Sequence, residues 1–162
     1  MKHRTIALIC ASGALAMGQV ATAAPRPDAK LWNGTWQLNS EKSKFSSAEY
    51  TTKKDVRTYT VTGNRLTMHS DLINGAGQAI KWGYSATLNG KWFRATGNPN
   101  ADQVALTLIS PRELRSETRL KGKPSAKATV SVSADGKEIT VKRSLATPKG
   151  DTDDTMIYER TK

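Results

Sequence analysis

The chain has 162 residues, with 25 Lys and Arg against 14 Asp and Glu, a formal net charge of +11, one cysteine and two histidines. The single cysteine excludes an internal disulfide framework, and so few Cys and His residues exclude the usual zinc ligand sets. The length fits one domain, and the excess of positive charge predicts an attraction for anions.

The first 23 residues have the organisation of a signal peptide. Two basic residues precede an uncharged apolar run from Thr5 to Val20, and Ala21-Thr22-Ala23 has the form of a cleavage site. The apolar run is short for a membrane span, although a retained anchor is the alternative. We therefore expect cleavage near Ala24, no membrane span afterwards, and a bacterial protein that is periplasmic or secreted. Cleavage removes Cys10 and leaves a net charge of +9.

Residues 24–33 are expected to form an N-terminal tail, and residues 34–162 a single domain. In this domain, short runs of alternating apolar and polar residues are separated by turn residues about every twelve positions. The predicted strands cover residues 32–39, 55–62, 64–72, 78–88, 91–96, 103–110, 113–120, 126–134, 137–146 and 152–160. This pattern predicts an all-β fold, a single antiparallel up-and-down β-barrel of eight to ten strands with little helix.

Local signals add detail at three of the connections. Asn89-Gly90 and Asp135-Gly136 predict hairpins with type I′ turns, in which both central residues have positive φ. Ser40 is placed to cap one helical turn over residues 41–44, because a serine side chain accepts hydrogen bonds from free amides at a helix start.

The alternation also predicts which side chains face the barrel interior, since successive residues of a strand point to opposite faces. The inward faces hold a set that we expect to contact any bound ligand: Trp82, Tyr84, Leu106, Val141, Arg143 and Tyr158. Arg94 falls in register with Trp92, which predicts a second inward arginine.

An inward Arg143 has two interpretations, because a buried guanidinium is costly unless it is paired. In the first, Arg143 binds the carboxylate of an anionic ligand, and its replacement by Met would stabilise the empty protein. In the second, Arg143 pairs with an inward Asp or Glu, or a bulge turns it out to water. The choice depends on contacts that a strand pattern does not supply.

The sequence offers no strong catalytic constellation and predicts no cofactor or metal. Outside the signal peptide the one histidine is His69, which shares a strand face with Thr67 and Asp71 and is expected to be solvated. The basic residues are scattered along the chain, so export and this distribution both argue against nucleic acid as a partner.

Both ends of the predicted barrel resemble the calycin superfamily. The opening Gly34-Thr35-Trp36 resembles the G-x-W signature of lipocalins, and Met156-Ile157-Tyr158-Glu159-Arg160 is similar to the last strand of fatty-acid-binding proteins. The resemblance implies that Trp36 lies across the barrel floor with Arg160 packed on it. Met156 stands where fatty-acid-binding proteins have an arginine, which departs from a simple fatty-acid carrier.

The stretch from Gly34 onward also resembles small exported bacterial proteins with lipocalin-like barrels and no assigned activity. The segments that carry this likeness are Gly34–Asn39 with Lys42–Phe45, Gly97–Asp102 and Val132–Lys137.

Three functions follow from these observations. The first is a non-catalytic barrel that binds a small, largely apolar or anionic molecule in the cell envelope. The second is an enzyme on the same barrel, with Arg143, Tyr84 and Tyr158 polarising a small hydrophobic substrate. The third is a protein without a pocket whose basic outer surface contacts polyanions or an anionic envelope surface. A cavity lined by apolar side chains favours the first two.

Overall fold

The structure is a computed structural model that describes residues 25–161, so the predicted signal peptide and Cys10 lie outside the described residues. One short helix precedes ten strands. The elements are α1 (Ala29–Trp32), β1 (Gly34–Lys44), β2 (Thr52–Thr62), β3 (Arg65–Asn74), β4 (Ala79–Thr87), β5 (Asn89–Asn98), β6 (Ala101–Ser110), β7 (Glu113–Leu120), β8 (Lys123–Val132), β9 (Glu138–Leu145) and β10 (Thr152–Arg160). No helix among these residues has the length and apolar character needed to cross a membrane.

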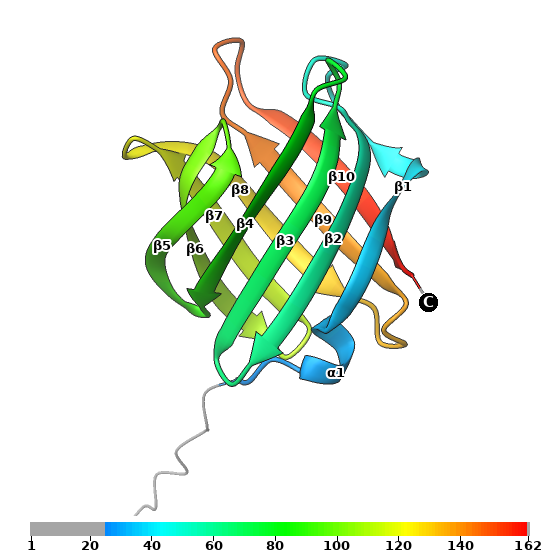
Figure 1. The fold of residues 1–162 in the computed structure, drawn as a ribbon, viewed down its shortest axis with the longest axis vertical. Coiled ribbons are helices and arrows are strands. Elements are labelled where there is room, and N and C mark those ends of the chain that lie inside the picture. The colour runs from blue at the N-terminus through cyan, green and yellow to red at the C-terminus, as the bar shows by residue number, and fades with distance from the viewer. Residues whose placement is uncertain (1–24, 162) are drawn as a thin grey trace, which may run out of the picture.

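The ten strands form a closed antiparallel barrel in which each strand pairs with its neighbours in the chain (Figure 1). The barrel closes where β1 pairs with β10, with Trp36 opposite Arg160 and Leu38 opposite Tyr158. Closure gives every strand a partner on both sides, although β4 and β5 pair only at Gly83 with Thr96 and at Tyr84 with Ala95. Paired edges are protected from a common route to aggregation. The predicted all-β, up-and-down barrel is therefore confirmed.

Period-two alternation decides which residues fill the interior. On β2, Tyr59 and Val61 are buried whereas Thr58, Thr60 and Thr62 are exposed. Apolar side chains leave water on the inner face, and hydroxyl and charged groups stay hydrated outside.

The start of the barrel differs from the prediction. Trp32 ends helix α1 instead of opening a strand, so the expected tail contains an ordered turn with a fully buried indole. The predicted helical turn over residues 41–44 is wrong, because β1 runs on to Lys44. Asn39 Oδ1 accepts hydrogen bonds from the amides of Glu41 and Lys42, where the pairing with β10 shifts register. The Asn39 side chain thus satisfies amides that the shifted ladder leaves free.

The predicted type I′ turns are also wrong. Among the described residues, Lys121 is the one non-glycine with positive φ, at 50°, and Gly122 follows it at 80°. The β7–β8 turn therefore has the backbone that we assigned to Asn89-Gly90 and Asp135-Gly136.

Strand β5 is turned relative to its predicted face. Phe93 packs against the core and Ala95 is buried, whereas Trp92 and Arg94 are exposed on the outside. The inward Arg94 is thus a wrong prediction, because the ladder with β6 shifts register between Asn89 and Trp92 and again beyond Arg94.

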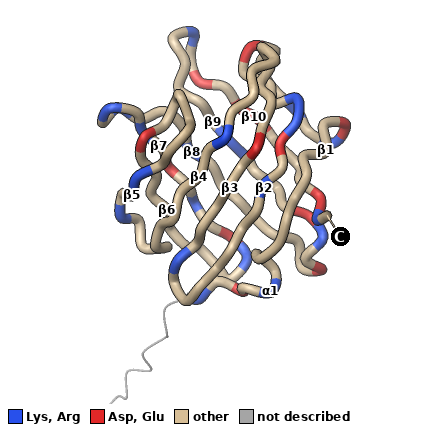
Figure 2. The backbone as a smooth tube through the Cα atoms, in the orientation of Figure 1, with Lys and Arg blue, Asp and Glu red and all other residues tan. Residues whose placement is uncertain are grey.

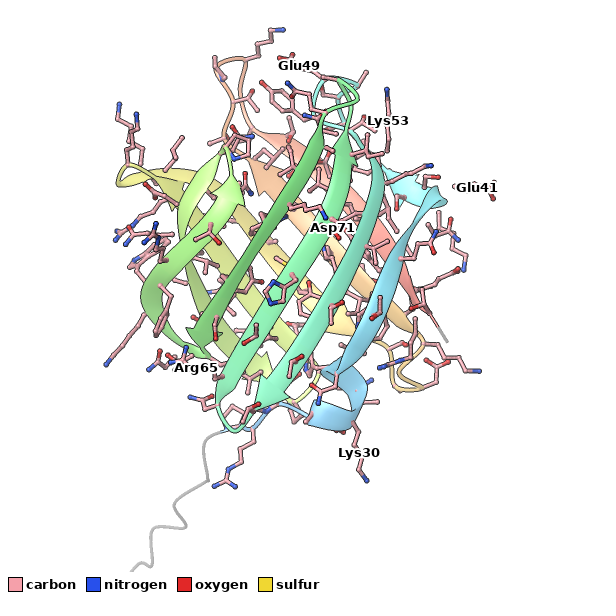
Figure 3. All side chains as sticks on the ribbon, viewed as in Figure 1. Lys30, Glu41, Glu49, Lys53, Arg65 and Asp71 are labelled. Atoms are coloured by element: carbon pink, nitrogen blue, oxygen red, sulfur yellow. The ribbon has the colours of Figure 1, made fainter. Side chains whose placement is uncertain are left out.

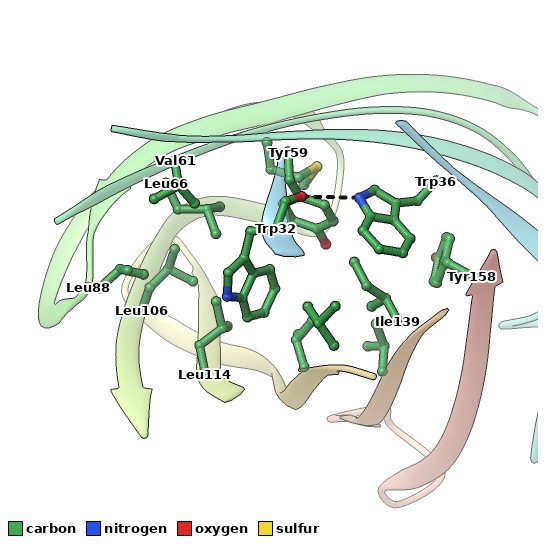
Figure 4. Packing of buried hydrophobic residues seen from close by; sticks show 14 of the residues in the cluster. Trp32, Trp36, Tyr59, Val61, Leu66, Leu88, Leu106, Leu114, Ile139 and Tyr158 are labelled. Atoms are coloured by element: carbon green, nitrogen blue, oxygen red, sulfur yellow. Dashed lines mark hydrogen bonds between the residues drawn. The ribbon is translucent and has the colours of Figure 1, made fainter. Parts of the chain in front are cut away.

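Helix α1 closes one end of the barrel with tryptophans (Figure 4). Trp36 Nε1 donates to the Trp32 carbonyl at 3.2 Å, and Trp32 Nε1 donates to the Pro111 carbonyl at 3.0 Å. Side chains around them are almost completely buried: Leu66, Leu106, Leu114, Ile139 and Tyr158. This end is consequently a packed core.

Arg160 seals the same end from outside. Its guanidinium lies 4.1 Å from the centre of the Trp36 ring. It donates to the carbonyls of Gly136 at 2.6 Å, Asn33 at 2.5 Å and Leu31 at 2.6 Å. One side chain therefore ties α1 and the β8–β9 turn to the last strand.

Candidate functional site

A cavity of about 200 Å³ lies between the inner strand faces, beyond the packed core and towards the end opposite α1. Figure 3 shows the two ends, with Lys30 beside α1 and Glu49 above the other end. The walls include Arg57, Tyr59, Met68, Leu72, Ile80, Trp82, Tyr84, Thr118, Ala128, Val141, Arg143 and Met156. The β1–β2 connection adds Glu49, Tyr50 and Thr51 at the mouth.

A buried carboxylate organises the inner end of this cavity. Asp55 is 1% exposed and accepts three hydrogen bonds, from Arg57 Nε at 2.8 Å, Tyr158 Oη at 2.7 Å and Ser70 Oγ at 2.7 Å. Residues 55 and 57 share an inward face of β2 because they are two positions apart. These bonds satisfy Asp55 without a ligand, as a buried charge requires.

Arg57 has N–H donors that make no hydrogen bond to the described residues. Its guanidinium lies 4.5 Å from the centre of the Tyr158 ring, Nε donates to Asp55, and the Tyr59 hydroxyl is close enough to hydrogen-bond the same guanidinium. Burial would lower the pKa of Arg57, but Asp55, Tyr158 and Tyr59 together raise this pKa well above its ordinary value. A guanidinium has five N–H donors, so an always-charged fork remains for a group inside the cavity.

Two aromatic side chains from β4 form part of the cavity wall, and each has a polar group, an indole N–H or a phenol hydroxyl. The rings of Trp82 and Tyr84 lie 5.6 Å apart at 54°, and both line the cavity. Trp82 Nε1 is buried, and no described residue accepts its hydrogen. Burial raises the pKa values of Tyr84 and Tyr158, so both phenols stay protonated at neutral pH. These groups can donate hydrogen bonds but are poor general bases.

Arg143 is committed to the protein itself. Its Nη2 donates to Asp154 at 2.6 Å and to the Tyr50 carbonyl at 3.3 Å, and Nε donates to Asp154 at 3.2 Å. Asp154 also accepts from the Ser46 amide at 3.0 Å and hydroxyl at 3.1 Å. The pair thus holds the β1–β2 connection over the mouth.

The second interpretation of Arg143, pairing with an inward acid, therefore describes the empty protein. The expected gain in stability from Arg143→Met assumed an unpaired arginine, and that prediction is wrong. Loss of Arg143 would leave Asp154, which is 3% exposed, without its cation.

The six residues predicted to contact ligand do not all meet at the cavity. Trp82, Tyr84, Val141 and Arg143 line it. Leu106 belongs to the packed core, and Tyr158 lies behind the wall, bonded to Asp55. Whether any of them binds a ligand stays a prediction.

Sequence reasoning missed Asp55, Arg57 and Ser70. The signal for Asp55 and Arg57 was present on β2, where both lie on the same strand face as the inward Tyr59 and Val61. A charged pair in phase with an apolar face predicts a buried ion pair, whereas nothing in the local sequence marks Ser70.

The described residues contain no group of three or more His, Cys, Asp and Glu side chains placed to hold a metal. His69 is exposed on the outer face of β3, as its strand position predicts.

Comparisons with known proteins identify a fold neighbour but no family. No family model matches the chain, and no curated protein matches it. A solved structure of the zebrafish ileal bile acid-binding protein, complexed with cholic acid, is similar, with a TM-score of 0.53. The match covers 81% of this chain and 99% of that protein at 10% sequence identity. At this identity the likeness shows the fold alone, a closed antiparallel β-barrel.

Proposed function

We propose that this barrel binds a small amphipathic anion, with Arg57 bonded to the anionic group and the aromatic wall around the apolar body. The observation that carries the proposal is a buried arginine in the cavity wall, in the same register row as Trp82 two strands away and on the same inner surface as Tyr84. The Asp55–Arg57 pair has no net charge, so Arg57 would recognise the anionic group of the ligand through the geometry of its hydrogen bonds. Planar guanidinium groups suit carboxylates for this reason.

The size of the cavity limits the ligand. Pockets for drug-sized ligands measure about 300–1,000 Å³, and this one measures about 200 Å³. A compact ligand fits the closed state, and a longer one requires the β1–β2 connection to move. The neighbour's bile acid is a large amphipathic anion, which supports the chemical class without assigning that ligand to this chain.

The place of action is part of the proposal. The leader-like residues 1–23 support export to the periplasm or the medium, where the barrel would carry or sequester its ligand in the cell envelope.

A pair of probes that differ only in their head group tests the anchor. We expect octanoate to bind more tightly than octanol, measured by displacement of the fluorescent anion anilinonaphthalene sulfonate. A charge-assisted hydrogen bond contributes about 1.5–3 kcal/mol, or about 10- to 100-fold in affinity. Arg57→Lys keeps a charge beside Asp55 but loses the planar fork, so octanoate affinity should fall about tenfold while the fold persists.

Arg143→Lys is the matched control, because Arg143 lines the same cavity but is already bonded to Asp154. Octanoate affinity should change less than about threefold in this variant. If Arg143→Lys weakens octanoate and Arg57→Lys does not, Arg57 is not the anchor. Equal binding of octanoate and octanol to the unaltered protein would remove anion recognition altogether.

A further inference from the structure

The outer surface of the barrel is strongly asymmetric in charge. Residues 89–132, which form β5 to β8, hold eight Lys and Arg against three Asp and Glu. None of the ion pairs within the described residues involves this stretch, whereas some basic residues elsewhere pair, as Lys81 does with Asp71 and Lys42 with Glu159. In Figure 2 the basic positions recur along β5 and at the β7–β8 turn.

Strand register places these cations side by side on one wall. Arg94 lies opposite Gln103, which lies opposite Arg119. In the next row on this face, Glu117 lies opposite Lys127. In the row after that, Arg115 lies opposite Thr129, which lies opposite Lys142 on β9. Neighbouring strands are about 4.8 Å apart, so a planar array of negative charges meets several of these side chains together. Glu117 is the one carboxylate in these rows.

Apolar groups are exposed within the same wall. Trp92 is 38% exposed and Ile109 is 45% exposed. The Arg119 guanidinium lies 4.2 Å from the centre of the Trp92 ring, and Arg119 Nε is fixed by a 2.6 Å hydrogen bond to Gln103. The result is a preformed pair of an indole and a cation on the surface.

The outer surface of β2 to β4 differs from that of β5 to β8. Its outward residues include the hydroxyl-bearing Thr58, Thr60, Thr67 and Ser85. Its Lys81 is paired with Asp71, whereas Lys53, Lys54 and Arg65 are exposed and in no ion pair of the described residues, and Val56 is 41% exposed. Among the described residues, the exposed pair of an indole and a guanidinium is therefore found on one side of the barrel.

We propose that the outer wall of β5 to β8 docks on the surface of an anionic phospholipid bilayer, with Lys142 of β9 at its border. Unpaired Lys and Arg attract the headgroups, and Trp92 and Ile109 enter the interfacial region, where an amphipathic indole is favoured. A soluble polyanion matches the charges but offers nothing to the exposed apolar groups, so the lipid surface fits better. Trp92, Arg115, Arg119 and Lys127 do not line the cavity, so this docking wall is independent of the proposed ligand site.

The test is co-sedimentation with vesicles of phosphatidylglycerol and phosphatidylcholine, compared with phosphatidylcholine alone. The wall variant is Arg94→Gln/Arg115→Gln/Lys127→Gln, and the matched control is Lys44→Gln/Lys53→Gln/Lys54→Gln. All six side chains are exposed, and neither set belongs to an ion pair of the described residues. Both variants lose three charges and share the same N-terminal segment, so its contribution to lipid binding cancels.

We expect binding to anionic vesicles to weaken about 10- to 100-fold in the wall variant and less than about threefold in the control. Trp92→Ala should weaken it severalfold on its own, and added salt should weaken it in the unaltered protein. Octanoate binding should be the same in both triple variants, so a failure of docking is separate from a failure of the cavity proposal.

Equal losses in the two triple variants would show that net charge alone attracts the vesicles, and would overturn the docking wall. Equal binding to vesicles with and without phosphatidylglycerol would overturn it as well. A third outcome would also overturn it: the unaltered protein binds heparin but no vesicles, and the wall variant loses heparin binding. The wall would then be a site for soluble polyanions.

Discussion

The two ends of this barrel use the same residue types in opposite ways. At the α1 end, Arg160 donates to three carbonyls and covers Trp36, so its fixed bonds leave little for a ligand. At the cavity, Arg57 donates from Nε to Asp55, lies over Tyr158 and has Tyr59 beside it, which leaves several of its five N–H donors unused. The difference teaches that burial of an arginine is a poor guide to its role, whereas the count of its unused donors is informative.

Arg143 is intermediate between these cases. It lines the cavity as Arg57 does, but its donors are bonded to Asp154 and to the Tyr50 carbonyl, as those of Arg160 are bonded to carbonyls. We therefore assign it to the closure of the mouth.

The largest expected effect is at the closed end. Trp36→Ala should destabilise the protein by about 3–5 kcal/mol, because it opens a void in a packed core. Urea unfolding measures the loss, and Trp36→Phe should show a smaller one. Molecules that remain folded should bind octanoate with unchanged affinity, since Trp36 does not line the cavity. A loss below about 1 kcal/mol would contradict a structural role for this end.

At the inner end of the cavity, Asp55→Ala should destabilise by about 3 kcal/mol, because it leaves a buried guanidinium without its anion. The hydroxyls of Ser70 and Tyr158 also lose their acceptor. Thermal unfolding of Asp55→Ala and of Asp55→Ala/Arg57→Met gives the comparison. The double variant should recover part of the stability; if it is less stable than the single variant, the ion pair is not the source of the loss.

At the mouth, Arg143→Met should destabilise by about 1.5–3 kcal/mol, since charged hydrogen bonds to Asp154 are lost. Hydrogen exchange should rise in residues 45–51, which Asp154 and Arg143 hold through Ser46 and Tyr50. The control is Trp36→Phe, which should leave exchange in this segment unchanged. Unaltered exchange in Arg143→Met would show that the pair does not hold the connection.

The smallest effect concerns Tyr158. Tyr158→Phe should cost about 1 kcal/mol at neutral pH, because one of three bonds to Asp55 is removed. The pKa of Tyr158 is raised in the folded protein by burial and by Asp55, partly offset by Arg57. The unfolded chain, with a tyrosine pKa of about 10, therefore releases this proton first as the pH rises.

This difference has a definite sign. The stabilising contribution of protonated Tyr158 is complete below about pH 10 and is lost as the pH rises towards the folded-state value. Unfolding curves between about pH 9 and pH 11 should fall less steeply in Tyr158→Phe than in the unaltered protein. Parallel slopes would mean that Tyr158 ionises in the folded barrel as it does in water.

The sequence by itself determined the barrel. Period-two alternation with regular turns predicted the all-β class, eight to ten strands and the inward placement of Trp82, Tyr84 and Val141, because each of these depends on neighbours one or two residues away. Local reasoning failed at β5, where the shifts in register reversed the face of Arg94. It also failed at residues 41–44, where pairing with β10 prevailed over a helix cap.

Only the tertiary structure decided which arginine is free. Asp55 meets Tyr158 from 103 positions away, and Arg143 reaches Tyr50 across 93 positions. Such partners are set by barrel closure between β1 and β10 and by how the β1–β2 connection covers the mouth, and a strand pattern specifies neither. The alternation predicts that an arginine lies on the inner face. Its partner there comes from strands distant in the chain, because a guanidinium bonds to the acceptors that the closed barrel brings within about 3 Å.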